Sequence, residues 1–536
     1  MQFLNRRKMI VTTMLSLAFT VMQITGFRIA LTYHTTVHRS ALMQEIGRAI
    51  TGKYCLLAAL LEFIAFEAAF CLLFTLLERT AVSNEKNRSR KWIGLAAALL
   101  FVCWLPCLLA GYPGYFNYDA FSQVPQALYE EVPYSAHHPL IHTLIMGKVI
   151  SFGYHHGTTL NDGIFLHSIF QMSVCALAFA YIIWYLSKNT AKGAFAAFCY
   201  YAFFPPIAMF AMSTTKDVLF SVCLQLTVIF VYEMCRDFPG FFASKWKICR
   251  FVFTALLMCM LRKNGVYAFL CLVPFVAWFY RDFRKKTVLL FVSITLLYAL
   301  ADNGLIRLLD AEKGSAEEML SVPMQQIARV YCDHGEEAFT DRELELIYRG
   351  ITREQLLNYN PFLSDNIKNY FDFQAILDDR SGYLCLWIKK AVQYPGAYLN
   401  AFLDNTYQAW YPGTSVCSEP GEHTSYFEMV MWAGGERDSK APRLLEFYRK
   451  IAEDFYYQKL PAVRLLFSIG AMFWVMLFVL AFAIYRKNRP LVTTMLLALL
   501  YCLTLFLGPV SLVRYYLVLF YGFPVNVCYL FSSKSR

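Results

Sequence analysis

The sequence predicts an all-helical membrane protein with about twelve transmembrane helices, interfacial helices in an outer loop, and a small, mostly helical outer domain. Three observations support this fold class. Of the 536 residues, 58% are hydrophobic and only 16% are charged, which is too apolar for a soluble globular protein. Aromatic residues make up 17% of the chain, as expected for helices anchored at membrane interfaces. Basic residues gather in short segments between the apolar runs.

A spanning helix needs about 20 mostly apolar residues. We expect spans at 8–30, 54–77, 91–110, 161–187, 193–212, 217–235, 249–262, 264–280, 287–302, 463–485, 490–507 and 513–532. Every second connection is basic, and Lys and Arg favour the cytoplasmic side of a membrane. Because the number of spans is even, both termini and the basic loops are expected in the cytoplasm. This topology explains the net charge of +11 better than nucleic-acid binding does.

The expected spans divide the chain into four parts. Residues 1–90 hold two helices and a cytoplasmic loop, and the first helix is expected to be a retained signal anchor rather than a cleaved signal peptide. Residues 91–302 form a transmembrane core with a first outer loop at 111–160. In residues 303–460 acidic side chains outnumber basic ones, which predicts a helical extracytoplasmic domain. Residues 461–536 supply the last three helices.

Two smaller features of the outer regions follow from length and spacing. The segment His138 to Phe152 is too short to cross, so we expect a helix that lies in the interface or re-enters partway. Most of the 16 cysteines fall inside spans as small packing residues. Cys332, Cys385 and Cys417 are the outer ones, and a disulfide between two of them is one alternative. Ligand spacing typical of zinc is absent from the sequence.

The first outer loop carries an isolated carboxylate and a histidine pair. Asp119 has three interpretations: the N-cap of a helix that begins at Ala120, a metal ligand, or a general base. His137 and His138 stand before Pro139, at the start of the interfacial helix. They fit metal binding, donation to a phosphate oxygen, or simple placement among lipid headgroups. His142 is expected to pack in the interface.

Three further outer turns carry charge at the ends of spans. Lys216 could bind a lipid phosphate or extend its ammonium group to the membrane surface. Asp217, near a helix N-terminus, has a favourable interaction with the helix macrodipole. Arg262 and Lys263 form either an anion clamp or a headgroup-binding turn. Arg514 lies at the start of the last span, on the outer side, where the positive-inside topology does not account for an arginine. A bidentate contact with phosphate is therefore favoured.

These charges come from separate segments but converge on the face opposite the basic loops, which predicts a site at the membrane edge. Cations there can stabilise a leaving phosphate, and a carboxylate can deprotonate an attacking hydroxyl. That chemistry suits a lipid-linked phosphate. The sequence contains no Gly-rich phosphate loop or nucleophile elbow, which argues against a soluble nucleotide donor.

From about residue 91 onward the chain resembles the GT-C superfamily of polytopic glycosyltransferases, and is most similar to an uncharacterised branch from Gram-positive bacteria. Members carry an acidic catalytic residue and two membrane-lying helices in the first outer loop, which Asp119 and the segment after His138 match. The similar blocks are Thr215-Lys216-Asp217, Arg262-Lys263-Asn264-Gly265, Pro323-Met-Gln325-Gln326-Ile-Ala-Arg329, Tyr394-Pro395-Gly396-Ala-Tyr398-Leu-Asn400, Trp410-Tyr411-Pro412 and Arg514-Tyr515-Tyr516.

The resemblance implies transfer of a sugar from a polyprenyl-phosphate carrier to an acceptor at the outer face, with inversion at the anomeric carbon. The acceptor would be a cell-envelope glycan or lipid. Asp119 would be the base, with Lys216, Arg514, Arg262 and Lys263 near the carrier phosphate and His137, His138 and Asp217 in support. Many members pair acidic residues in this loop, whereas Asp119 stands alone until Glu130 and Glu131. A requirement for a divalent cation, Mg²⁺ or Mn²⁺, therefore stays open.

Two other classes share the apolar, charge-bearing character of this chain. One is a transporter or lipid flippase, whose site is usually near the midplane between repeated halves. This sequence has no such halves and places its charges at one edge. The other is a non-catalytic envelope-assembly membrane protein, which would be indifferent to loss of Asp119.

Overall fold

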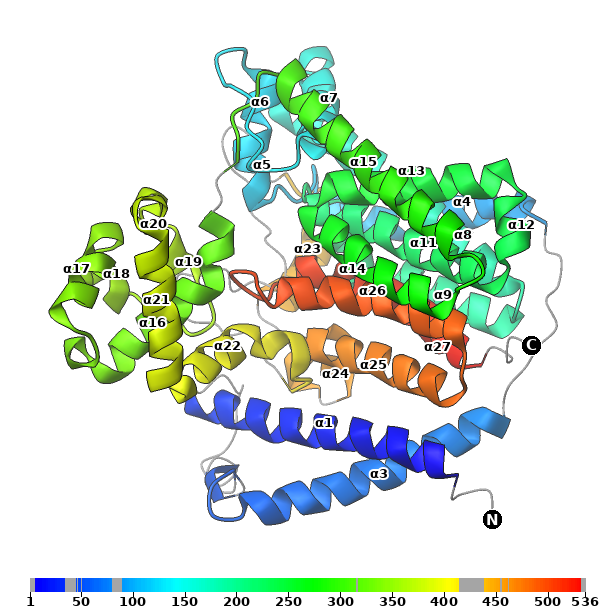
Figure 1. The fold of residues 1–536 in the computed structure, drawn as a ribbon. Coiled ribbons are helices and arrows are strands. Elements are labelled where there is room, and N and C mark those ends of the chain that lie inside the picture. Colours follow the sequence, from blue (N-terminus) through cyan, green and yellow to red (C-terminus); the bar gives the residue numbers. More distant parts are fainter. Residues whose placement is uncertain are drawn as a thin grey trace.

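A computed structural model gives the architecture of the chain (Figure 1). It describes residues 5–33, 45, 47–49, 51–79, 89–314, 317–413, 438–453, 456–460 and 462–531. Within these residues the fold is helical throughout and contains no strand, only isolated bridges. The all-helical prediction is confirmed. Cys417, Lys86, Arg88, Lys534 and Arg536 lie outside the described residues.

Long apolar helices build the main body. In the described part of the chain, six helices are long and apolar enough to cross a membrane: α1 (Arg6–Thr32), α3 (Cys55–Arg79), α4 (Lys91–Ala110), α8 (Leu160–Ser187), α11 (Lys216–Arg236) and α15 (Arg284–Leu308). Shorter apolar helices accompany them: α14 (Lys263–Phe279), α25 (Ile469–Tyr485) and α26 (Arg489–Leu505). Together with α13 (Lys245–Leu261) and α27 (Leu517–Leu530), each falls on one of the expected segments.

Local backbone chemistry breaks several of the expected segments. The segment 193–212 divides into α9 (Ala191–Phe203) and α10 (Pro205–Ala211), bent by 61°, because Pro205 and Pro206 cannot continue a preceding helix. Arg262 has an extended backbone that ends α13 and begins α14, so the expected division there is confirmed. Ser468 likewise separates α24 (Val463–Phe467) from α25.

The centre of the body is α11, whose side chains are buried along most of its length. It packs against α8, α13, α26 and α27. The segment after His138, for which an interfacial position is predicted, forms α7 (Leu140–His156), and this helix lies against α8. A Cβ added at Gly163 would lie 2.3 Å from the Ile150 carbonyl oxygen, so a glycine there allows the two backbones to approach closely. This contact positions the first outer loop over the helix bundle.

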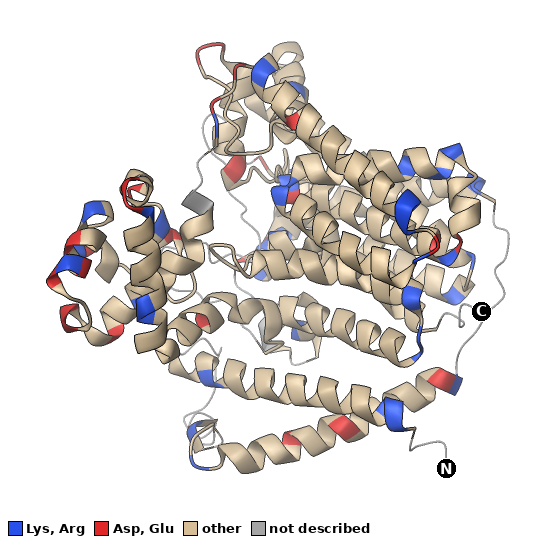
Figure 2. Cartoon of the chain, viewed as in Figure 1, with Lys and Arg blue, Asp and Glu red and all other residues tan. Residues whose placement is uncertain are grey.

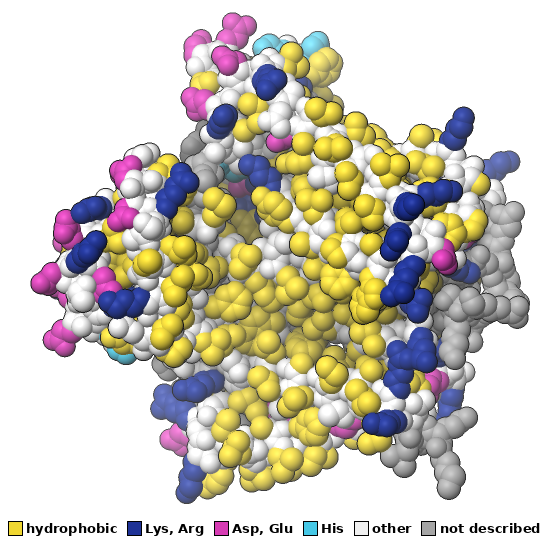
Figure 3. All heavy atoms as spheres, in the orientation of Figure 1, with side chains coloured by type: hydrophobic (Ala, Val, Ile, Leu, Met, Phe, Trp, Pro, Cys, Tyr) yellow, Lys and Arg dark blue, Asp and Glu magenta, His cyan; other side chains and the backbone are white. Residues whose placement is uncertain are grey.

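One end of the bundle is basic (Figure 2). We call this the basic end; α3, α8, α11, α14 and α25 end there, and α1 begins there. Lys8 pairs with Glu78 at 2.8 Å, and Arg7 donates to the Ile484 carbonyl at 2.6 Å. These contacts bring the start of α1 together with the ends of α3 and α25. Between this end and the opposite one, the surface is predominantly hydrophobic (Figure 3).

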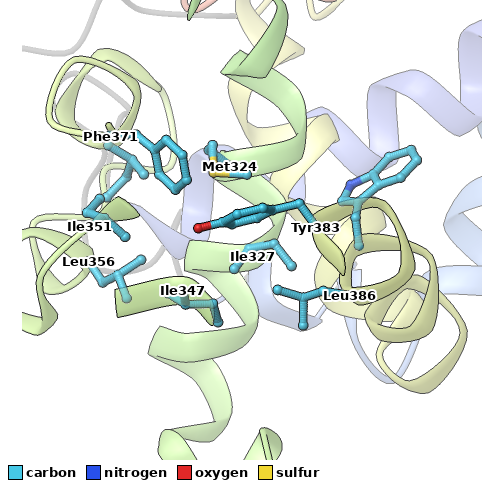
Figure 4. Close-up of a pocket in the computed structure, with 10 residues that line it drawn as sticks. Met324, Ile327, Ile347, Ile351, Leu356, Phe371, Tyr383 and Leu386 are labelled. Atoms are coloured by element: carbon cyan, nitrogen blue, oxygen red, sulfur yellow. The ribbon is translucent and has the colours of Figure 1, made fainter. Parts of the chain in front are cut away.

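A second hydrophobic core lies beside the bundle and belongs to residues 317–398, which we call the outer domain. Its helices are α16 (Ser321–His334), α17 (Asp341–Gly350), α18 (Arg353–Leu357), α19 (Asp365–Lys368), α20 (Phe373–Asp378) and α21 (Arg380–Gln393). Figure 4 shows the gap that they enclose; apolar side chains line it and its volume is about 10 Å³. Such a gap holds one water at most and is part of the core. Cys332 and Cys385 in this domain are both free thiols.

The outer domain is joined to the bundle at several points. Helix α22 (Pro395–Trp410) runs from it to pack on α25. Asp404 of α22 accepts from Tyr33 at the end of α1 at 2.7 Å and pairs with Arg329 of α16 at 2.8 Å. Farther along, Asn405 donates to the Gly508 carbonyl at 3.0 Å. The domain therefore contacts the connection between α26 and α27 that leads to Arg514.

Candidate functional site

Backbone pairing places the first outer loop against the turn before α11. The Tyr115 amide donates to the Met212 carbonyl at 3.2 Å, and the Thr214 amide donates to the Tyr115 carbonyl at 3.0 Å. Asn117 reinforces this contact, since its own amide donates to the Thr214 hydroxyl at 2.8 Å. The pairing brings the segment that begins α5 (Tyr118–Gln123) next to Lys216.

Asp119 is a ligand of cations and not the N-cap of a helix. Asn117 occupies the N-cap position of α5, and Asp119 lies within the first turn, so the capping interpretation of Asp119 is wrong. Its carboxylate forms a short ion pair with Lys216 and a second ion pair, at 3.2 Å, with Arg514. Lys216 also lies 3.2 Å from Nδ1 of His138. An ammonium group only donates, so Nδ1 is the acceptor and the His138 proton is on Nε2.

Asp217 forms the second half of the site and is fully buried. Arg262 donates to its Oδ1 at 2.6 Å, and the Thr215 hydroxyl donates to its Oδ2 at 2.9 Å. Arg514 lies 3.8 Å from the same Oδ2, so this one guanidinium contacts both carboxylates. The Tyr515 ring lies below both guanidiniums, 4.4 Å from Arg262 and 4.9 Å from Arg514.

We call the six residues Asp119, His138, Lys216, Asp217, Arg262 and Arg514 the charged cluster. Three cations face two carboxylates, so the cluster carries one positive charge in excess when His138 is neutral. Asp119, Lys216, Arg262 and Arg514 are each between 11% and 13% exposed. Charge pairing at such burial is strong, and the excess cation favours an anionic ligand.

The electrostatics keep Asp119 ionised and His138 neutral. Burial alone would raise the pKa of the Asp119 carboxyl, but Arg514, Lys216 and His138 hold that pKa well below its usual range. Burial and the charge of Lys216 lower the pKa of His138 to about 3. At neutral pH the cluster therefore contains a carboxylate and an uncharged imidazole.

Two of the predicted site residues lie outside the cluster. Lys263 is exposed at the start of α14. His137 is exposed, and its ring lies 4.8 Å from the His138 ring on the outer side. Adjacent side chains at a turn point in different directions. Arg262 therefore reaches the site and Lys263 does not, and His138 reaches it while His137 does not.

Other residues of the site were not predicted from the sequence. Asn117 and Thr214 join the loop to the turn before α11, and the Tyr515 ring supports the guanidiniums. His142 was expected to pack in the interface, yet it is fully buried and contacts Oε1 of Gln123 at 3.2 Å. His167 of α8 is equally buried, and the described residues offer neither of its ring nitrogens a hydrogen-bond partner.

The donor set fits a divalent cation poorly. Both Asp119 oxygens and Oδ1 of Asp217 contact cationic nitrogens, which would repel Mg²⁺ or Mn²⁺. Among the residues that the structure describes, no three His, Cys, Asp or Glu side chains come together as metal ligands.

The ion pairs predict a pH-dependent stability. A depressed pKa means that Asp119 contributes stability fully above its unfolded-state pKa, about 3.9, and that this contribution is lost as pH falls below that value. Asp119→Asn should cost roughly 3 kcal/mol at neutral pH because it leaves buried cations without their partner. Melting temperatures of the purified protein should show a constant deficit from about pH 5 to pH 8 that narrows under more acidic conditions.

The control for this measurement is Glu130→Gln, in an exposed part of the same loop. It should leave the melting temperature unchanged over the whole range. An equal deficit in both variants, or one that grows steadily toward low pH, would contradict the assignment of Asp119 as an ion-paired carboxylate.

No curated protein and no solved structure matches the chain. The sequence model of a family of unknown function, DUF6020, matches residues 129–536, which is well over half of the chain. The match includes the turns that carry His138, Lys216, Asp217, Arg262 and Arg514, and it begins after Asp119. It also covers the outer domain and the last helices. The chain therefore belongs to the DUF6020 family.

Proposed function

We propose that the protein is a GT-C type membrane glycosyltransferase that transfers a sugar from a polyprenyl-phosphate-linked donor to a cell-envelope glycan or lipid. The observation that supports this most strongly is the Asp119 carboxylate, which is held between Lys216 and Arg514 at one end of the helix bundle. A phosphate and a carboxylate present similar oxygens to cations. The same two cations can therefore bind the carrier phosphate while Asp119 acts on the acceptor.

The proposed topology places this cluster outside the cell. The twelve predicted segments would all cross, with both termini and the basic end in the cytoplasm and the charged cluster at the extracytoplasmic face. Alternating helix ends support this arrangement: α11 begins at Lys216 of the cluster and ends at Arg236 of the basic end. The contacts of Lys8 with Glu78 and of Arg7 with the Ile484 carbonyl also require α1 to begin where α3 and α25 end.

The proposed reaction exchanges ion partners. On donor binding, the carrier phosphate takes over Lys216 and Arg514, and Asp119 loses the two contacts that depress its pKa. The freed carboxylate becomes a better base and accepts the proton of the acceptor hydroxyl. The acceptor oxygen then bonds to the anomeric carbon as the bond from that carbon to the phosphate oxygen breaks. The electron pair leaves with the phosphate, whose charge the cations stabilise, and the anomeric centre inverts.

The remaining residues have positioning roles in this proposal. Asp217 and Arg262 orient Arg514, since Asp217 contacts both guanidiniums. His138 directs the Lys216 ammonium through its Nδ1 acceptor. The outer domain would bind the acceptor. Figure 3 shows a hollow between that domain and the lobe of α5–α7, with acidic, basic and histidine side chains at its floor.

The test of function is sugar transfer by the purified protein in liposomes, with radiolabelled polyprenyl-phosphate sugars and crude envelope acceptor. Asp119→Asn should lower transfer by about 10²–10⁴-fold, because it removes the base. Lys263→Gln is the matched control: it neutralises an exposed cation next to Arg262 and should retain transfer. Equal transfer by wild type and Asp119→Asn would exclude Asp119 as the base. Movement of labelled lipid across the vesicle without any acceptor would instead support a flippase.

Native cysteines test the topology. Cys332 and Cys385 are exposed on the outer domain, and Cys249 is exposed near the basic end of α13. A membrane-impermeant maleimide applied to intact cells should modify the first two, and Cys249 only after permeabilisation. Peptide mass spectrometry measures each site separately. Modification of Cys249 in intact cells, with Cys332 and Cys385 protected, would reverse the proposed orientation.

A further inference from the structure

A second polar cavity lies at the basic end of the bundle, remote from the charged cluster. Its volume is about 430 Å³. The last turns of α8 and α11 and the first turns of α13 surround it, together with Arg90 before α4. Because α11 runs from Lys216 in the cluster to Arg236 in this cavity, the two sites occupy opposite ends of the same helix.

The cavity is strongly cationic. Among the described residues that line it, Glu233 and Asp237 are acidic, and they are outnumbered by five basic residues: Arg90, Lys188, Arg236, Lys247 and Arg250. Arg250 forms a short ion pair with Glu233, and Lys247 lies 4.0 Å from Asp237. Five cations and two carboxylates in the described lining leave an excess of three positive charges. An anion entering the cavity would be attracted by all of them.

Aromatic side chains hold several of these cations in place. The Lys188 ammonium lies 4.0 Å above the Trp184 ring, and the Arg90 guanidinium lies 5.5 Å from the same ring. Arg250 lies 4.5 Å from the Phe230 ring and donates to the Tyr181 hydroxyl at 3.0 Å. Cations that are already ordered lose less conformational entropy when they bind a ligand.

Arg250 retains unused hydrogen-bonding capacity. Its side chain is 15% exposed, and its Nε has no hydrogen-bond partner within the described part of the chain. A buried guanidinium N–H without an acceptor is costly, and a bound anion or water would relieve that cost. The excess charge and this unsatisfied donor both indicate an oxyanion ligand.

We propose that this cavity binds the phosphate of an anionic phospholipid headgroup. Its basic lining lies at helix ends, where the apolar belt of the protein surface gives way to charged residues (Figures 2 and 3). Trp246 at the rim is 65% exposed, as is common for tryptophan at the headgroup level. A headgroup reaches the cavity from the bilayer, and its acyl chains can stay on the adjoining apolar surface. The site is distinct from the proposed donor site because the two lie at opposite ends of α11.

The experiment compares lipid binding by full-length variants, measured by native mass spectrometry in detergent. Arg90→Gln/Lys188→Gln removes two cavity cations that take no part in the ion pair of Arg250 with Glu233. Phosphatidylglycerol affinity should fall about tenfold or more, at roughly 1 kcal/mol for each cation near the surface. Lys285→Gln/Lys286→Gln is the matched control, since both residues are exposed at the same end and neither lines the cavity. Its affinity should stay within about twofold of wild type.

Two further arms identify the ligand. Phosphatidylcholine should bind more weakly than phosphatidylglycerol, and soluble glycerol phosphate should compete only at much higher concentration because it lacks the acyl chains. Equal losses in the two double variants would overturn the proposal in favour of a diffuse basic surface. Phosphatidylcholine binding as tight as phosphatidylglycerol binding would also overturn it. Effective competition by glycerol phosphate would assign the cavity to a soluble phosphate compound instead of a lipid. Unchanged melting temperatures would confirm that each variant is folded.

Discussion

The ion pairs of Arg514 with Asp119 and Asp217 are the constraint on which the site depends. Arg514 lies more than 390 residues after Asn117, to which it also donates, and close to the end of the chain. Its guanidinium joins the first outer loop to the start of α11. Arg262 then adds the junction of α13 and α14 through Asp217. Four distant segments are thus connected through two carboxylates, and none of them can move without exposing an unpaired buried charge.

In the proposed reaction, the two carboxylates of the cluster would have different roles, one catalytic and one structural. Asp217 is fully buried and satisfied by Arg262 and Thr215, so it suits a permanent structural role. Asp119 is slightly exposed, and its partners are cations that a phosphate can also use. A lysine is the more mobile of these partners, whereas the planar guanidinium of Arg514 stays fixed by its second carboxylate. We infer that ligand exchange occurs at Asp119 and leaves Asp217 in place.

Helix positions were well predicted from the sequence because long apolar runs admit few alternatives. All twelve expected segments coincide with helices, and the division at Arg262 was found from three polar residues in a row. The break at Pro205 was missed, although two consecutive prolines signalled it. Convergence of the charges followed from the alternation of basic loops. The alternation of basic loops did not reveal which charged side chains contact one another, because side-chain direction at a turn depends on local geometry. Lys263 and His137 therefore lie outside the cluster, while Asn117 and Tyr515 contact its arginines.

The most direct test of the ion-exchange account is the affinity of the purified protein for a polyprenyl phosphate that carries no sugar, measured for wild type and Asp119→Asn. In the wild type, the Asp119 carboxylate and the phosphate compete for Lys216 and Arg514. The account predicts that Asp119→Asn binds the carrier more tightly than wild type, although it lacks the carboxylate proposed as the base. Weaker or unchanged binding by this variant would contradict the central claim that carrier phosphate and Asp119 share the same cations.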